Sequence, residues 1–91
     1  MKKSIRLHIT GSVQTLFFEQ FIMKHALDLK VRGYLRKLED GRIEIFAEGD
    51  HVNVDKLISV AKTGPQHSQI RNIAETPEKF QDFKEFKIVR I

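Results

Sequence analysis

Alternating hydrophobic periods constrain the fold of this chain more than any other feature of its sequence. Residues 4–10 alternate between apolar and polar side chains, which is the period of two of a half-buried strand. Residues 16–29 then carry apolar side chains at helical spacing, which predicts an amphipathic helix with Thr15 as its N-cap. The chain therefore begins with a strand that leads directly into a helix.

Strands and helices continue to alternate along the rest of the chain. Gly41 marks a hairpin turn, because glycine adopts positive φ angles without strain. Asp50 is the expected cap of a second helix, which ends at Gly64 and Pro65 because proline cannot continue a helix. The predicted elements are, in order, strand 4–10, helix 16–29, strands 31–38 and 42–48, a helix between 50 and 63, a weaker strand 66–74, a loop 76–83 and strand 85–91.

This order of elements predicts an α+β fold. A β-α-β-β-α-β succession is typical of the ferredoxin-like sandwich, in which two helices cover one face of a mostly antiparallel sheet. Residues 85–91 add an extra C-terminal strand. A length of 91 residues suits one domain over residues 1–91, and an apolar fraction of 41% excludes wholesale disorder. No apolar run approaches the roughly 20 residues of a membrane span, so we expect no membrane association.

Composition narrows the chemistry that the chain can perform. It contains no cysteine, which excludes disulfides, thiolate catalysis and cysteine-ligated metals. The four histidines fall on different predicted elements without the spacing of zinc ligands, so we expect neither a metal nor another cofactor. A net charge of +4 mildly favours anionic partners. We expect a cytoplasmic location, because the basic residues at 2–3 are not followed by the apolar stretch of a signal peptide.

The loop between the first strand and the first helix is a candidate anion site. A loop of this kind can direct several backbone N–H groups at one point, where the helix dipole also favours negative charge. We therefore expect a small anionic ligand, a phosphate or an acylphosphate, to bind here. The residues of this candidate loop are Gly11, Ser12, Val13, Gln14, Thr15 and Leu16.

The same segment resembles the signature of a known family. Residues 11–19, GSVQTLFFE, resemble the acylphosphatase motif G-x-V-Q-G-V-x-F-R, with matches at Gly11, Val13, Gln14 and Phe18. Residues 33–41, GYLRKLEDG, resemble the second motif of that family, G-W-V-R-N-x-x-D-G. Because the resemblance spans most of the chain in the correct order, it implies the acylphosphatase form of the ferredoxin-like fold.

The resemblance also implies an activity. Acylphosphatases hydrolyse the carboxyl–phosphate bond of acylphosphates without a metal. In the family, the loop backbone and the motif's Arg hold the phosphate, and the Asn of the second motif positions the attacking water. Such phosphoryl transfer depends on positioning and electrostatics, with little covalent work for the protein.

This chain departs from the family pattern at both of these side chains. Glu19 falls on the Arg position and Lys37 on the Asn position, and Thr15 replaces the second glycine of the loop. Glu19 offers acceptors and a negative charge where the family offers a fork of donors. Lys37 can only donate, so it cannot orient water as Asn does. The resemblance therefore implies a catalytically impaired acylphosphatase-like protein.

Two further expectations concern these substitutions. No other basic residue of the sequence is expected to replace the missing Arg, since the side chain of Arg36 points to the opposite face of its strand from Lys37. Glu19 and Lys37, in contrast, are expected to lie together and to form an ion pair in the vacated pocket.

Other functions remain open. One alternative is a working acylphosphatase with altered side-chain roles. Another is a non-enzymatic protein-binding domain, whose edge strands could host a strand of a protein partner. Binding of nucleic acid is not expected: Phe46, with Arg6 and His8, lies on the sheet face away from the helices, but the chain lacks the aromatic pair of RNA-binding sheets.

Overall fold

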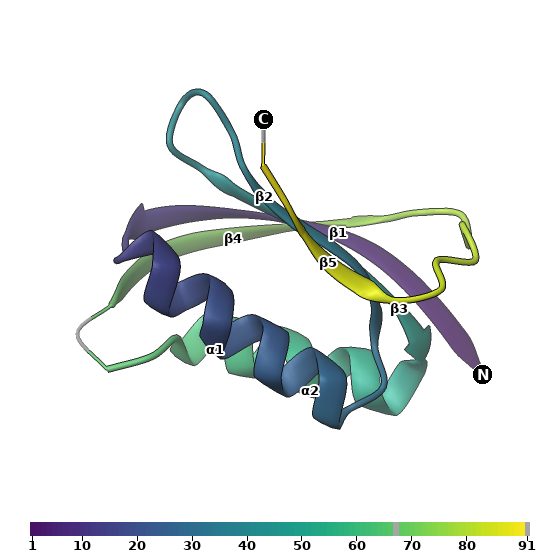
Figure 1. Cartoon of the computed structure of the whole chain (residues 1–91). Coiled ribbons are helices and arrows are strands. Elements are labelled where there is room, and N and C mark those ends of the chain that lie inside the picture. The colour runs from purple at the N-terminus through teal and green to yellow at the C-terminus, as the bar shows by residue number, and fades with distance from the viewer. Residues whose placement is uncertain (67, 91) are drawn as a thin grey trace.

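Two helices pack on one face of a five-stranded sheet (Figure 1). The computed structural model describes residues 1–66 and 68–90, so His67 and Ile91 of the predicted strands lie outside the described residues. The elements are β1 (Lys2–Ser12), α1 (Thr15–Asp28), β2 (Arg32–Lys37), β3 (Ile43–Asp50), α2 (His51–Thr63), β4 (Gln69–Pro77) and β5 (Phe86–Val89).

The strand order is β4-β1-β3-β2-β5. β5 pairs in parallel with β2, and all other neighbours pair antiparallel. Between Thr10 and Gly11 the register of β1 against β4 shifts, which leaves an irregularity at that edge. This topology confirms the predicted ferredoxin-like sandwich, with the extra C-terminal strand at one edge of the sheet.

The core lies between the sheet and the helices. Alternate residues of β1 and β3 point into it, as their period of two predicts, and α1 and α2 each contribute one apolar side. Buried core residues include Ile5, Leu7 and Ile9 from β1, Phe18, Ile22 and Ala26 from α1, Ile43, Ile45 and Ala47 from β3, and Val54, Leu57, Ile58 and Ala61 from α2.

Most differences from the predicted elements lie at their ends. Asp50 caps α2 as predicted, since its carboxylate accepts a hydrogen bond from the Val52 N–H at 3.2 Å. Thr15 is not the N-cap of α1: that position belongs to Gln14, which makes no side-chain cap, and Thr15 is the first helical residue. β4 continues to Pro77, three residues beyond the prediction, because β1 keeps pairing with it where the apolar pattern fades.

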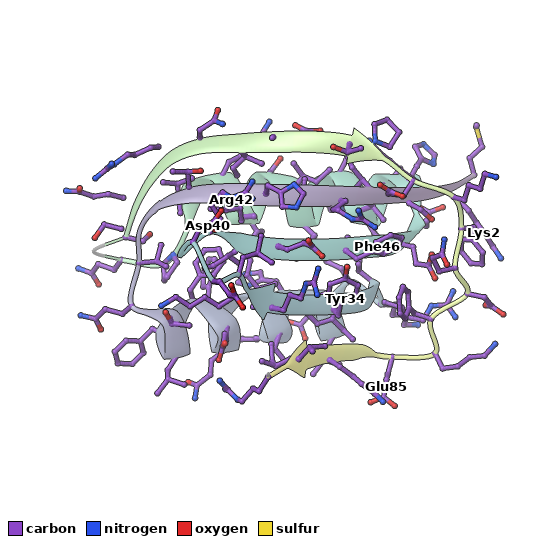
Figure 2. All side chains as sticks on the ribbon, turned by 90° about the horizontal axis from the view of Figure 1, so that it is seen from above. Lys2, Tyr34, Asp40, Arg42, Phe46 and Glu85 are labelled. Atoms are coloured by element: carbon purple, nitrogen blue, oxygen red, sulfur yellow. The ribbon has the colours of Figure 1, made fainter. Side chains whose placement is uncertain are left out.

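The helix-free face of the sheet is partly covered by the chain between β4 and β5. The buried carboxylate of Glu48 accepts hydrogen bonds from the backbone N–H groups of Gln81 and Phe83 and ties this segment down. Tyr34 stacks on the ring of Phe46 (Figure 2). The ring of Phe83 packs edge-on against Phe46. Phe46 is on the predicted face but only 2% exposed, so it offers no open platform for stacking a base.

A second buried carboxylate, Glu44, is held on the same face. Tyr34 donates its hydroxyl to Glu44, and Arg36 donates from Nε at 3.1 Å and from Nη2 at 3.2 Å. The Nε2 atom of His8 lies 3.1 Å from the same carboxylate. Burial would raise the pKa of Glu44, but the hydrogen bonds from these partners outweigh it and lower the pKa to about 2.

Glu44 therefore makes the stability of the fold depend on acid. A carboxylate whose pKa falls on folding stabilises the native state above its unfolded pKa and loses that effect as the pH drops through the folded pKa. We expect Glu44 to contribute about 3 kcal/mol that disappears between about pH 4.5 and pH 2. In urea unfolding across this range, the free energy of unfolding should fall less steeply with decreasing pH for Glu44→Gln than for the wild type. The control Glu75→Gln, at a half-exposed carboxylate paired with Lys62, should keep the steep fall of the wild type.

Gly33 lets β2 approach β3 closely. Its φ is 140°, and a Cβ built on it would lie 1.8 Å from the carbonyl oxygen of Phe46. Gly41, in the hairpin, also has a positive φ of 92° but no neighbouring atom within 4 Å of such a Cβ. The two positions share an unusual backbone angle and differ in crowding.

Replacing these glycines by alanine should separate the two effects. Backbone strain alone costs about 1–3 kcal/mol, so Gly41→Ala should lower the free energy of unfolding by that amount at most. Gly33→Ala should cost more, because the strands must also move apart. Equal losses in urea unfolding would show that the close approach at Gly33 does not matter.

Candidate active site

The candidate site lies where the ends of three strands meet the start of a helix. β1, β2 and β5 finish at the same end of the sheet, because β1 and β2 both run antiparallel to β3 and β5 runs parallel to β2. α1 begins there as well, directly after β1. In Figure 1 the end of β1, the start of α1 and the hairpin after β2 gather on the left of the molecule. Both family motifs noted in the sequence are thereby brought to one end of the fold.

The predicted anion loop forms a continuous turn from β1 into α1. Gly11 and Ser12 still pair with β4, and Thr15 and Leu16 open the first turn of the helix. A Cβ on Gly11 would lie 2.2 Å from the carbonyl oxygen of Gln69, so glycine is needed for β4 to approach. The first turn of α1 contains no acidic residue, and Gln14 provides no side-chain cap. The N–H groups of this first turn therefore have no side-chain cap, and binding of an anion by the loop stays a prediction.

Glu19 is buried and paired, but not with the predicted partner. Its carboxylate is 4% exposed and accepts a hydrogen bond from Arg90 Nη2 at 2.7 Å. Lys37 instead points its Nζ at Thr15 Oγ1, at 3.4 Å. The predicted Glu19–Lys37 ion pair is therefore wrong, because the carboxylate of Glu19 pairs with the guanidinium of Arg90 at the end of β5.

Arg90 is the site residue that sequence reasoning missed. Arg90 was not considered as a partner of Glu19, because parallel pairing of the last strand with β2 cannot be deduced from the order of elements. A signal was present in the alternation of the last strand. Phe86 is buried in the core and Ile88 packs against it, so the next residue in phase, Arg90, also points towards the helices.

These side chains line an open hollow of about 510 Å³. Its charges nearly balance, with carboxylates from Glu19 and Glu39 and cations from Lys37 and Arg90. Donors face the hollow from Lys37 and Arg90, while the carboxylates oppose an anionic guest. The lining residues are Thr15, Glu19, Lys37, Leu38, Glu39, Val89 and Arg90.

Two kinds of arrangement are absent from the described residues. Within 1–66 and 68–90, no group of three or more His, Asp or Glu side chains is arranged to hold a metal ion. His25, for example, bonds through Nδ1 to the carbonyl of Phe21 in its own helix. No helix in the same ranges is long and apolar enough to cross a membrane.

Comparison with known proteins agrees with this geometry. The sequence profile of the Acylphosphatase family matches residues 5–88. An acylphosphatase of Caldanaerobacter subterraneus subsp. tengcongensis is 35% identical over 89 residues, which cover 97% of this chain and 99% of the relative. The crystal structure of acylphosphatase from Bacillus subtilis superposes with a TM-score of 0.91 at 28% identity, over 99% of this chain and 100% of the Bacillus protein.

A longer protein contains the same fold as one part. The crystal structure of full-length HypF in its phosphate- and nucleotide-bound form matches with a TM-score of 0.89 at 25% identity, over 99% of this chain but only 12% of HypF. The predicted fold is thus confirmed by solved acylphosphatase structures as well as by its topology. Its sequence profile, its relatives and its fold together make this chain a member of the acylphosphatase family.

Proposed function

We propose that this chain is an anion-binding member of the family in which hydrolysis of acylphosphates is impaired. The observation that carries the proposal is the buried Glu19 carboxylate in the hollow at the start of α1. In the motif that residues 11–19 resemble, this position belongs to a phosphate-binding Arg. A positively charged guanidinium, which donates hydrogen bonds, is thereby replaced by a negatively charged carboxylate, which accepts them.

The charge exchange weakens the hold on a phosphoryl group. One unit-charge contact at about 4 Å contributes on the order of 4 kcal/mol at an effective dielectric of about 20. Arg90 offsets the charge of Glu19, but the two together are neutral, whereas an unpaired Arg would leave a full positive charge facing the phosphate. Transition-state stabilisation of this electrostatic kind is the main source of rate in metal-free phosphoryl transfer.

The second loss concerns the water nucleophile. Lys37 lies where the second motif has Asn, and its ammonium has three donors but no acceptor. Thr15 Oγ1 already accepts a hydrogen bond from Lys37 Nζ at 3.4 Å. The ammonium of Lys37 would therefore donate a hydrogen bond to the oxygen of a nearby water. That oxygen is the atom that has to attack the phosphorus.

A second candidate function is a working acylphosphatase. It is favoured by one observation: Arg90 brings a guanidinium into the hollow from β5. If this guanidinium contacts the phosphate as well as Glu19, it takes over part of the role of the motif's Arg.

Hydrolysis of benzoyl phosphate distinguishes the two candidates. We expect kcat/KM of the wild type to lie at least about 100-fold below that of the Bacillus subtilis acylphosphatase measured alongside it. The double variant Glu19→Arg/Lys37→Asn restores the motif residues and should recover activity, because it returns a donor fork and a water-orienting amide. Wild-type turnover equal to that of the relative would contradict impairment and favour the second candidate.

A matched control separates site chemistry from net charge. Lys84→Asn/Glu85→Arg changes the same residue types in the segment before β5, near the opposite end of the sheet. It should leave hydrolysis at the wild-type rate, because these side chains lie outside the hollow.

A further inference from the structure

The register of the parallel pair places two cations side by side. Leu35 of β2 pairs with Ile88 of β5, and Leu35 is buried under the helices while Ile88 packs against the core. Lys37 and Arg90 each follow by two residues, so both side chains point to the helix side at the same end of the sheet. Each lines the hollow beside Thr15.

Glu19 fixes the position of one of these cations. A carboxylate that is only 4% exposed has little water to solvate it, so it holds the Arg90 guanidinium at 2.7 Å. The guanidinium carries five N–H donors, and its bond to Glu19 uses one nitrogen, Nη2. Arg90 itself is 64% exposed, so its side chain is accessible to a ligand from solution.

We propose that Arg90, held in place by Glu19, is the guanidinium that binds a phosphoryl anion in this hollow, with Lys37 as the second cation. The inference rests on the proposed function and names the residues through which anion binding persists. In this arrangement the binding guanidinium comes from the last strand rather than from α1. Its planar fork suits two oxygens of a tetrahedral phosphoryl group, while Lys37 adds a point charge from β2.

Glu39 sets the strength of binding. Its carboxylate lines the same hollow and opposes an anion, so the wild type should bind weakly, with a dissociation constant in the millimolar range. Removing this charge with Glu39→Gln should tighten binding at least twofold. This dependence on Glu39 would show that the anion binds in the hollow, and the variants of Arg90 then test the guanidinium itself.

Titration with inorganic phosphate tests the inference. Amide shifts of residues 12–16 and the Nε–H signal of Arg90 are followed by NMR at constant ionic strength, with chloride exchanged for phosphate. We expect saturable shifts in the wild type and at least fivefold weaker binding in Arg90→Gln. Arg90→Lys should bind with intermediate affinity, because it keeps the charge and loses the fork. Lys37→Gln should weaken binding at least twofold.

Arg32→Gln is the control for loss of an arginine. Arg32 opens β2 at the end opposite Lys37 and is outside the hollow, so its loss should change phosphate affinity less than twofold. Each variant is first checked for a dispersed spectrum. If Arg90→Gln does not fold, Arg90→Lys decides by the same comparison, with wild-type affinity counting against the inference. Absence of saturable shifts in the wild type, or less than fivefold weakening in Arg90→Gln, would overturn it.

The two proposals fail in different ways. Arg90-dependent phosphate binding together with hydrolysis at the relative's rate would overturn impairment and leave the role of Arg90 standing. Weak hydrolysis together with phosphate binding that ignores Arg90 would keep impairment and overturn the role of Arg90.

Discussion

The parallel pairing of β5 with β2 is the contact on which the candidate site depends. It carries the last strand to the edge of the sheet and brings the ends of two strands together below the start of α1. Without it Arg90 would have no fixed relation to Glu19, and the hollow would lose one wall. A backbone hydrogen bond holds the start of this pairing: the N–H of Gly33 donates to the carbonyl of Glu85 at 3.0 Å, just before β5 begins.

Three buried carboxylates give this small domain its polar framework, and each is satisfied differently. Glu44 is bound by side chains of the two neighbouring strands, His8 of β1 and Tyr34 and Arg36 of β2, and Glu48 by the hydroxyl of Ser4 and two backbone N–H groups of the segment before β5. Among the described residues, Glu19 has Arg90 as its one side-chain partner, and Arg90 is largely exposed. Since an unpaired buried charge is costly, the site carboxylate is the least secured of the three and responds most to a change at its partner.

The sequence predicted the fold well because its local patterns agree with the tertiary arrangement. Periods of two and of 3.6 located β1, α1 and β3, and Gly41, Asp50 and Gly64 located turns and helix ends. Pairing between distant segments was predicted less well. The continuation of β4 to Pro77 and the approach of Arg90 to Glu19 both depend on which strands become neighbours, and a single sequence carries only faint traces of that choice.

Glu19 and Lys37, the two substituted motif positions, do line one hollow, but of the predicted loop residues only Thr15 lines it, and the partner of Glu19 was predicted wrongly. Treating Glu19 and Lys37 as a pair assumed that two substituted positions compensate each other. The structure shows that compensation comes from a third element, which neither motif contains. Only the phase of the last strand, with Phe86 and Ile88 facing the core, indicated where Arg90 would point.

The outer border of β4 bears on how copies of this chain behave in a crowded solution. The N–H of Glu78 points inward to the Ser4 carbonyl at 3.1 Å, so the nitrogen of Pro77, one residue earlier, faces outward and offers no proton to an approaching strand. The register shift opposite Gly11 disturbs the same border at its other end. Because neither end of the edge strand β4 offers regular backbone hydrogen bonds, β4 disfavours edge-to-edge pairing with another copy and the fibril growth that such pairing starts.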